Sequence, residues 1–154
     1  MATVNASVSA ARAALPQQLV KPNLQGADVQ ILVSTYTVPA TGGPAIGDKI
    51  SWGLLPFGSR LMPGTRLYFA AGAASSTVTL GDPVAPARYL AATSVATAGS
   101  ATADAQFANG ALFEVAVAQQ GLPTDQSELL STVAGAGLLA GQVITLVAHY
   151  AGQN

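Results

Sequence analysis

The side chains that could carry out catalysis are few in this chain, and none lies in a recognisable catalytic pattern. There is one histidine, His149, and no cysteine, which excludes cysteine nucleophiles and cysteine-based zinc sites. A serine–histidine–aspartate triad would have to bring His149 together with residues such as Ser59 and Asp82. Their surroundings, "GSR" and "GDP", do not resemble the strained turn that exposes a serine nucleophile. A small hydrolase would therefore rest on His149 alone, and we expect this residue to be a packed or surface residue of a strand.

The acidic residues are dispersed as well, and most of them adjoin turn-forming residues. Aspartates in turns commonly accept hydrogen bonds from their own backbone. A calcium site needs several carboxylates at close spacing, whereas "TADAQFANG" contains only Asp104. A glycosidase-like acid pair stays open, because distant residues could meet in space, but no pattern signals one. We predict no catalytic residue, no cofactor and no metal site, and hence a protein that is not an enzyme. The carboxylates are Asp28, Asp48, Asp82, Asp104, Glu114, Asp125 and Glu128.

The basic residues do not form a pattern that would bind nucleic acid or a membrane. The net charge is −1, and the six lysines and arginines are scattered singly. Single-stranded nucleic acids are bound by basic grooves interleaved with aromatic side chains. Arg66 with Tyr68, and Arg88 with Tyr89, only weakly resemble such a pattern and are better explained as strand-edge or interface residues. No run approaches the 18 apolar residues of a membrane span. We therefore predict neither nucleic acid nor membrane among the partners.

The content of charged residues is low and bears on assembly. Charged residues make up 8% of the chain, against about 25% in typical soluble proteins. A folded monomer of 15.3 kDa exposes roughly 7,000 Å². Two explanations fit: a bland surface of small neutral residues, or a surface covered by other copies or by a partner. We favour the second and expect a homo-oligomer, either a dimer or a trimer.

Alternation of apolar and polar residues predicts an all-β protein. Short strands separated by glycine and proline turns are expected throughout, and no long amphipathic helix is present. The count is about seven to nine antiparallel strands, which is typical of a β-sandwich or jelly roll. Residues 28–154 would form this single domain. Residues 1–27 differ in composition, with Pro16, Pro22 and Gly26 as breakers, and are expected to form an extended N-terminal arm.

The expected strands also predict which residues share a face. In residues 29–38, Val29, Ile31 and Val33 share one face. The other face carries Gln30, Leu32, Ser34 and Tyr36. In residues 49–55 we expect Ile50, Trp52 and Leu54 on one side. The last strand, residues 143–150, is apolar on both faces, which is typical of a central strand or of one packed between a core and a neighbour. Its two predicted faces are Ile144, Leu146, Ala148 and Tyr150 on one side, and Val143, Thr145, Val147 and His149 on the other.

Several motifs in this order resemble a family of small phage proteins. "DKISWGLLPFGSRLMPGTRLYF" is followed by "STVTLGD" and "ARYLAATS", and the chain closes with "LLSTVAGAGLLAGQVITLVAHY". The order of an "LPxG" strand, an apolar strand, a "T-x-x-L-G-D" turn and an "RYL" segment is similar to that of decoration, or cement, proteins of tailed bacteriophages. The resemblance spans roughly residues 46–150. It implies a non-enzymatic sandwich or jelly-roll domain, usually dimeric or trimeric, that clamps neighbouring major capsid subunits, and it supplies no catalytic residues.

The resemblance leads to an expected function and a set of interface residues. We expect a structural virion protein on the capsid exterior, assembled in the host cytoplasm, whose partner is the major capsid protein. Large aromatic side chains often anchor interfaces, although burial in the core is the competing role for each of them. The alternative is a carbohydrate- or receptor-binding module of a phage tail or of a secreted bacterial protein. The predicted interface residues are Leu15, Leu19, Trp52, Phe57, Tyr68 and Tyr89.

Overall fold

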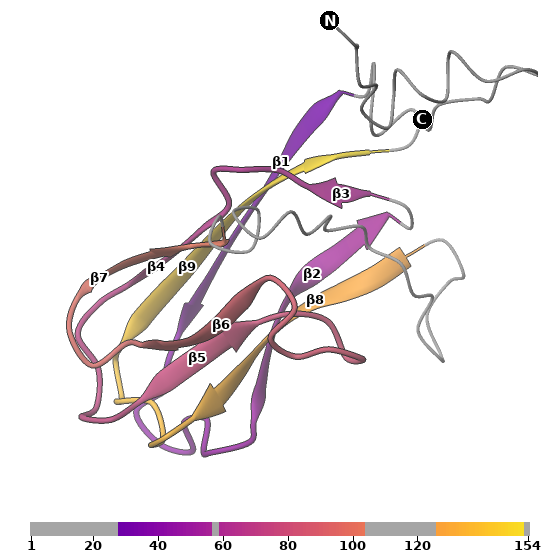
Figure 1. Ribbon diagram of the computed structural model, residues 1–154. Coiled ribbons are helices and arrows are strands. Elements are labelled where there is room, and N and C mark those ends of the chain that lie inside the picture. Colours follow the sequence, from indigo (N-terminus) through magenta and orange to yellow (C-terminus); the bar gives the residue numbers. More distant parts are fainter. Residues whose placement is uncertain (1–27, 57–58, 104–125, 153–154) are drawn as a thin grey trace, which may run out of the picture.

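The computed structural model describes residues 28–56, 59–103 and 126–152 of the chain, and all nine elements defined in these ranges are β-strands (Figure 1). All pairs formed by these strands are antiparallel, and the predicted all-β class is confirmed. No helix in the described ranges is long and apolar enough to cross a membrane. The strands are β1 (Val29–Thr37), β2 (Lys49–Pro56), β3 (Arg60–Leu61), β4 (Arg66–Phe69), β5 (Thr77–Leu80), β6 (Leu90–Ser94), β7 (Gly99–Thr102), β8 (Gln126–Ala134) and β9 (Val143–Ala151).

The strands form two sheets, which lie in separate layers in Figure 1. The first has the order β1-β9-β4-β7, with β3 also paired to β9, and the second has the order β2-β8-β5-β6. This arrangement confirms the predicted β-sandwich, while the narrower jelly-roll topology stays a prediction. Strand β9 is central, as its two apolar faces predicted, because it pairs with β1 along one edge and with β3 and β4 along the other. The predicted arm, residues 1–27, lies outside the described residues.

The core fills the space between the two sheets. Ile144, Leu146 and Ala148 of β9 are fully buried, and they belong to one hydrophobic cluster with Leu129 and Val133 of β8. The burial of every second residue along β9 matches the face predicted from the sequence. Each fully buried aliphatic side chain stabilises the fold by about 1.5–3 kcal/mol. The sandwich is therefore held mainly by apolar contacts between its two central strands and their neighbours.

A β-bulge in β2 changes the predicted face of one residue. The register of β2 against β8 shifts between Ser51 and Gly53, and Gly53 has a φ of +145°. Because a bulge adds one residue, the alternation of faces restarts after it. Trp52 and Leu55 are buried, whereas Leu54 is 43% exposed. The prediction that Leu54 shares the buried face of Trp52 is therefore wrong.

Two of the predicted interface residues are core residues of the folded chain. Trp52 is 4% exposed and Tyr89 is 1% exposed, and both belong to the hydrophobic cluster. The Trp52 indole Nε1 donates a hydrogen bond of 2.8 Å to the Ser131 hydroxyl oxygen, so its polar atom is satisfied inside the sandwich. Since neither side chain presents a surface, the idea that they anchor an interface is corrected: core burial, the competing role, applies to both.

Candidate functional site

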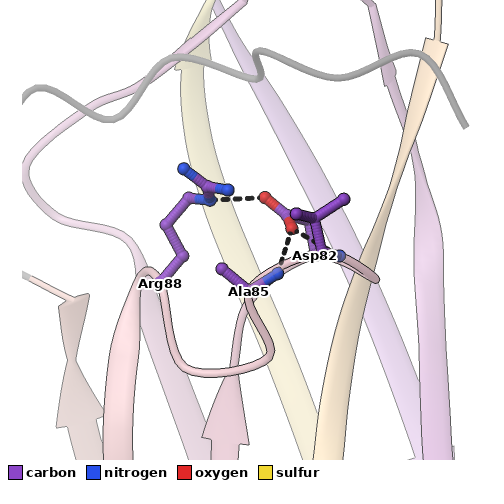
Figure 2. Close-up of polar contacts among 4 residues, drawn as sticks. Asp82, Ala85 and Arg88 are labelled. Carbon is purple, nitrogen blue, oxygen red and sulfur yellow. Dashed lines mark hydrogen bonds and ion pairs between the residues drawn. The ribbon is translucent and has the colours of Figure 1, made fainter.

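The loop between β5 and β6 is organised around the Asp82 carboxylate (Figure 2). Its Oδ1 accepts hydrogen bonds from the backbone amides of Val84 at 2.9 Å and of Ala85 at 2.7 Å. Its Oδ2 accepts one from Arg88 Nε at 2.5 Å. The backbone of the loop closes on itself as well, because the amides of Asp82 and Arg88 both donate to the Ala85 carbonyl. The predicted turn role of an aspartate that binds its own backbone is thus confirmed at Asp82.

The same carboxylate holds the tip of this loop in an exposed position. Asp82 is itself buried, whereas Val84 is 63% exposed. A short loop with this many internal hydrogen bonds has little freedom to reorganise. The apolar side chain of Val84 is therefore presented to solvent on a rigid support, an arrangement that suits contact with another molecule.

Tyr89 links this loop to the core. Its backbone amide donates to the Leu80 carbonyl at 2.9 Å, which closes the base of the loop. Burial raises the pKa of the Tyr89 hydroxyl well above its ordinary value, and the charge of Asp82 and a hydrogen bond to it raise this pKa further, while Arg88 lowers it. The hydroxyl therefore stays protonated in the folded protein at any physiological pH.

The raised pKa of Tyr89 predicts a loss of stability in alkali. An unfolded tyrosine ionises near pH 10, whereas the folded one keeps its proton, so the free energy of unfolding falls as pH rises above 10. One such group contributes a slope of about 1.4 kcal/mol per pH unit. Tyr89→Phe should therefore show a shallower loss between pH 10 and pH 12 in urea denaturation. An equal decline in both proteins would contradict the assignment.

The outer face of the five-stranded sheet carries a stripe of exposed apolar side chains. Val29, Ile31 and Val33 of β1 are each about three-fifths exposed, at 58%, 59% and 62%. Residues directly opposite in an antiparallel pair share a face, and β1 pairs with β9 over nine residues. Exposed Val143 of β9 and Tyr68 of β4 therefore lie on this face too. We call these five residues the outer stripe.

This face has no acidic residue at any position that the described strands contribute to it. The positions that share the face are the odd-numbered residues of β1 and β9, Arg60 of β3, and Arg66 and Tyr68 with their β7 partners. The side chains between the apolar residues are mostly threonines, and Thr35 and Thr145 hydrogen bond to each other across the two strands at 3.0 Å. The charged or titratable groups are Arg60, which is buried, Arg66 and His149. Such a face suits burial against another protein, since few charges would have to be desolvated.

Among the predicted interface residues, Tyr68 alone is exposed in the described ranges, with 45% of its surface accessible. It lies on the outer face, whereas Trp52 and Tyr89 lie within the core, so the three do not form one surface. Leu15, Leu19 and Phe57 lie outside the described residues. Sequence reasoning missed the role of Val29, Ile31 and Val33 as exposed residues, although it placed them on one face.

His149, the residue on which a hydrolase would depend, makes hydrogen bonds through its backbone to Met62 and Thr65. Its carbonyl accepts hydrogen bonds from the amide of Met62 at 2.8 Å and from the hydroxyl of Thr65 at 3.3 Å. The imidazole Nδ1 is buried without a hydrogen-bond partner. Among residues 28–56, 59–103 and 126–152, no group of three or more histidines, aspartates and glutamates could hold a metal ion.

Comparison with solved structures finds the same sandwich in two phage capsids. A chain in the capsid of Ralstonia phage GP4 matches with a TM-score of 0.63 and 21% identity, covering 88% of this chain and 92% of that chain. A chain in the capsid asymmetric unit of cyanophage Pam1 matches with a TM-score of 0.56 and 18% identity, covering 99% and 100%. The fold is one that phage capsids contain. No family model matches the chain, and no curated protein has significant sequence similarity to it.

Proposed function

We propose that this protein is a structural component of a bacteriophage virion, namely a decoration or cement protein that binds the outside of the major capsid shell. The observation that carries the proposal is the shared fold, which extends over at least nine-tenths of each matched capsid chain. The motif order described above supports decoration in particular. Assembly would take place in the host cytoplasm, and the protein would act by binding, without catalysis.

The surface of the sandwich supports a binding role. The outer stripe and the exposed Val84 loop tip offer apolar area, and burial of apolar area contributes about 25 cal/mol per Å². On a shell with many equivalent sites, an oligomer that binds several subunits at once gains avidity from modest individual contacts. Tyr68 is the strongest candidate for an anchor, because tyrosine is enriched among the residues that dominate interface energies.

The alternative function, a carbohydrate- or receptor-binding module, has less support on the described surface. Sugar-binding faces present several aromatic side chains close together. Among the aromatic residues that the structure describes, Tyr68 is the one classed as exposed, while Trp52, Phe69 and Tyr89 are buried. Binding of the purified protein to a glycan array, with no affinity for capsid shells, would favour this alternative.

The proposal predicts that the protein sediments with empty shells of the major capsid protein encoded in the same genome. Tyr68→Ala should weaken this binding about 30-fold, the equivalent of about 2 kcal/mol for an anchoring residue. Leu139→Ala, at an exposed apolar position in the β8–β9 turn, is the matched control and should bind like the wild type. Failure of the wild type to sediment with shells would overturn the proposed function. Unchanged binding by Tyr68→Ala would remove only Tyr68 from the contact.

A further inference from the structure

Strand β1 is an unprotected sheet edge. It pairs with β9 through all nine residues along one side, and in the described part of the chain no strand pairs with its other side. Long edge strands invite pairing with another chain unless charges, prolines, bulges or shortness prevent it. The sequence of β1, "VQILVSTYT", has no charge and no proline, and its outward side chains Val29, Ile31 and Val33 are apolar.

The other edge strands of the sandwich have such protection. Strand β2 contains Lys49, a bulge next to Gly53, and Pro56. Strand β7 has four residues and β6 has five. The outer strands of the two sheet orders are β1 and β7, and β2 and β6. Of these four, β1 alone is long, uncharged and free of a bulge. This contrast indicates that β1 has a strand partner in the assembled protein.

The amino-terminal sequence contains a segment of matching length and pattern. Residues 2–10, "ATVNASVSA", alternate strictly between apolar and polar side chains. The apolar set is alanine and valine, and the polar set is threonine, asparagine and serine. Strict alternation over nine residues is the pattern of a strand with one buried face. The segment has no charge, no proline and no glycine, and its nine positions equal the nine residues of β1.

We propose that residues 2–10 of one copy add as a strand to the free edge of β1 in a second copy. Strand addition of this kind gains main-chain hydrogen bonds along the edge. The 18 residues from Ala11 to Asp28 connect the segment to β1 and can extend over about 60 Å. They are long enough to reach the edge of a second copy, and the low content of charged residues, 8% of the chain, favours such self-association.

Exchange between two copies is compatible with the attachment of the arm to the start of β1. The connection ends at Asp28, directly before the first residue of β1, so the arm of each copy is joined to the strand that has the open edge. Two copies related by a two-fold axis could each donate one arm and accept the other, as closed dimers require. The arrangement is independent of capsid binding, so the oligomer and the proposed function can fail separately.

The first test changes the donated strand. Proline cannot donate a ladder hydrogen bond, and successive residues of a strand donate to opposite sides. Val4 and Ser7 donate to opposite sides, so the double variant Val4→Pro/Ser7→Pro removes a donor toward β1 in either register and should lose strand addition while leaving the sandwich intact. Gln18→Pro, in the connection, is the matched control. By light scattering, the wild type and the control should have at least twice the 15.3 kDa chain mass, and the double variant should have the chain mass. A monomeric wild type, or an oligomeric double variant, would overturn the proposal.

The second test changes the accepting edge and separates exchange from folding back. Lysines protect sheet edges, and Ile31→Lys/Val33→Lys alters side chains that are already about three-fifths exposed; urea denaturation checks that this variant is folded. We expect it to be monomeric. Mixed with the proline variant, it should form a heterodimer, because one protein keeps its arm and the other keeps its edge. A mixture that stays at the chain mass as concentration is raised would show that the arm does not exchange.

Discussion

Replacing Asp82 with alanine is expected to lower the free energy of unfolding by about 3 kcal/mol. The carboxylate is nearly inaccessible, and it accepts hydrogen bonds from two backbone amides and from Arg88. Removing one member of a buried ion pair typically costs 3–5 kcal/mol, and donors left without acceptors add to the loss. Because the Arg88 side chain is 31% exposed and can regain water, the lower end of that range applies. The measurement is urea denaturation at pH 7.

Asp48 offers a matched control for this experiment. Its Oδ2 accepts a backbone hydrogen bond from the Ala45 amide at 2.8 Å, but the residue is exposed and no ion pair is found for it in the described ranges. Asp48→Ala should therefore cost only about 1 kcal/mol. Asp82→Asn keeps an oxygen for the two amides but loses the charge, and should fall between the two. Equal losses for Asp82→Ala and Asp48→Ala would show that the buried network contributes no more than an exposed turn bond.

The alternation of side chains was sufficient to predict most of the described strands, but not β7, whose small and polar residues equally fit a loop. A half-buried strand must point every second side chain at the core, and β9 follows this rule from Val143 to Ala148. The faces of β1 were predicted as sets, but their orientation was not. Each set contains large apolar residues, and the set of Leu32 and Tyr36 packs against the core although it also contains Gln30 and Ser34. The choice of the inward set therefore depends on the sheet packed against β1, which lies far away in the sequence.

The candidate site could be predicted from the sequence only in part. Interfaces and cores both select large aromatic residues, so the type of Trp52, Tyr68 or Tyr89 does not distinguish the two environments. The burial of Tyr89 depends on the loop that Asp82 closes, and the burial of Leu55 in place of Leu54 depends on the bulge at Gly53. Each of these is a tertiary or local backbone feature that apolar periodicity does not encode.

Two glycines in the connection from β8 to β9 should respond very differently to the same substitution. Gly135 has a φ of +73° and Gly141 a φ of +79°, a region where other residues cost about 1–2 kcal/mol. A Cβ on Gly135 would lie 2.1 Å from the Ser75 carbonyl oxygen, whereas a Cβ on Gly141 would meet nothing within 4 Å. The contact at Gly135 is to the backbone of Ser75, which cannot be relieved by a change of rotamer. The backbone at Gly135 or at Ser75 must therefore move.

Gly135→Ala is therefore expected to destabilise the protein by about 3 kcal/mol, since overpacking adds 1–3 kcal/mol to the backbone strain. Gly141→Ala should lose about 1 kcal/mol, because it has the strain without the clash. Thermal and urea denaturation of the two variants would measure the difference. The turn containing Ser75 precedes β5, which pairs with β8, so the close approach of Gly135 to Ser75 sets how β5 joins the second sheet. Equal losses in the free energy of unfolding for the two variants would mean that the backbone at Ser75 moves aside without cost. Strand β5 would then not be held firmly at this end, and the Asp82 loop at its other end would lack a fixed support.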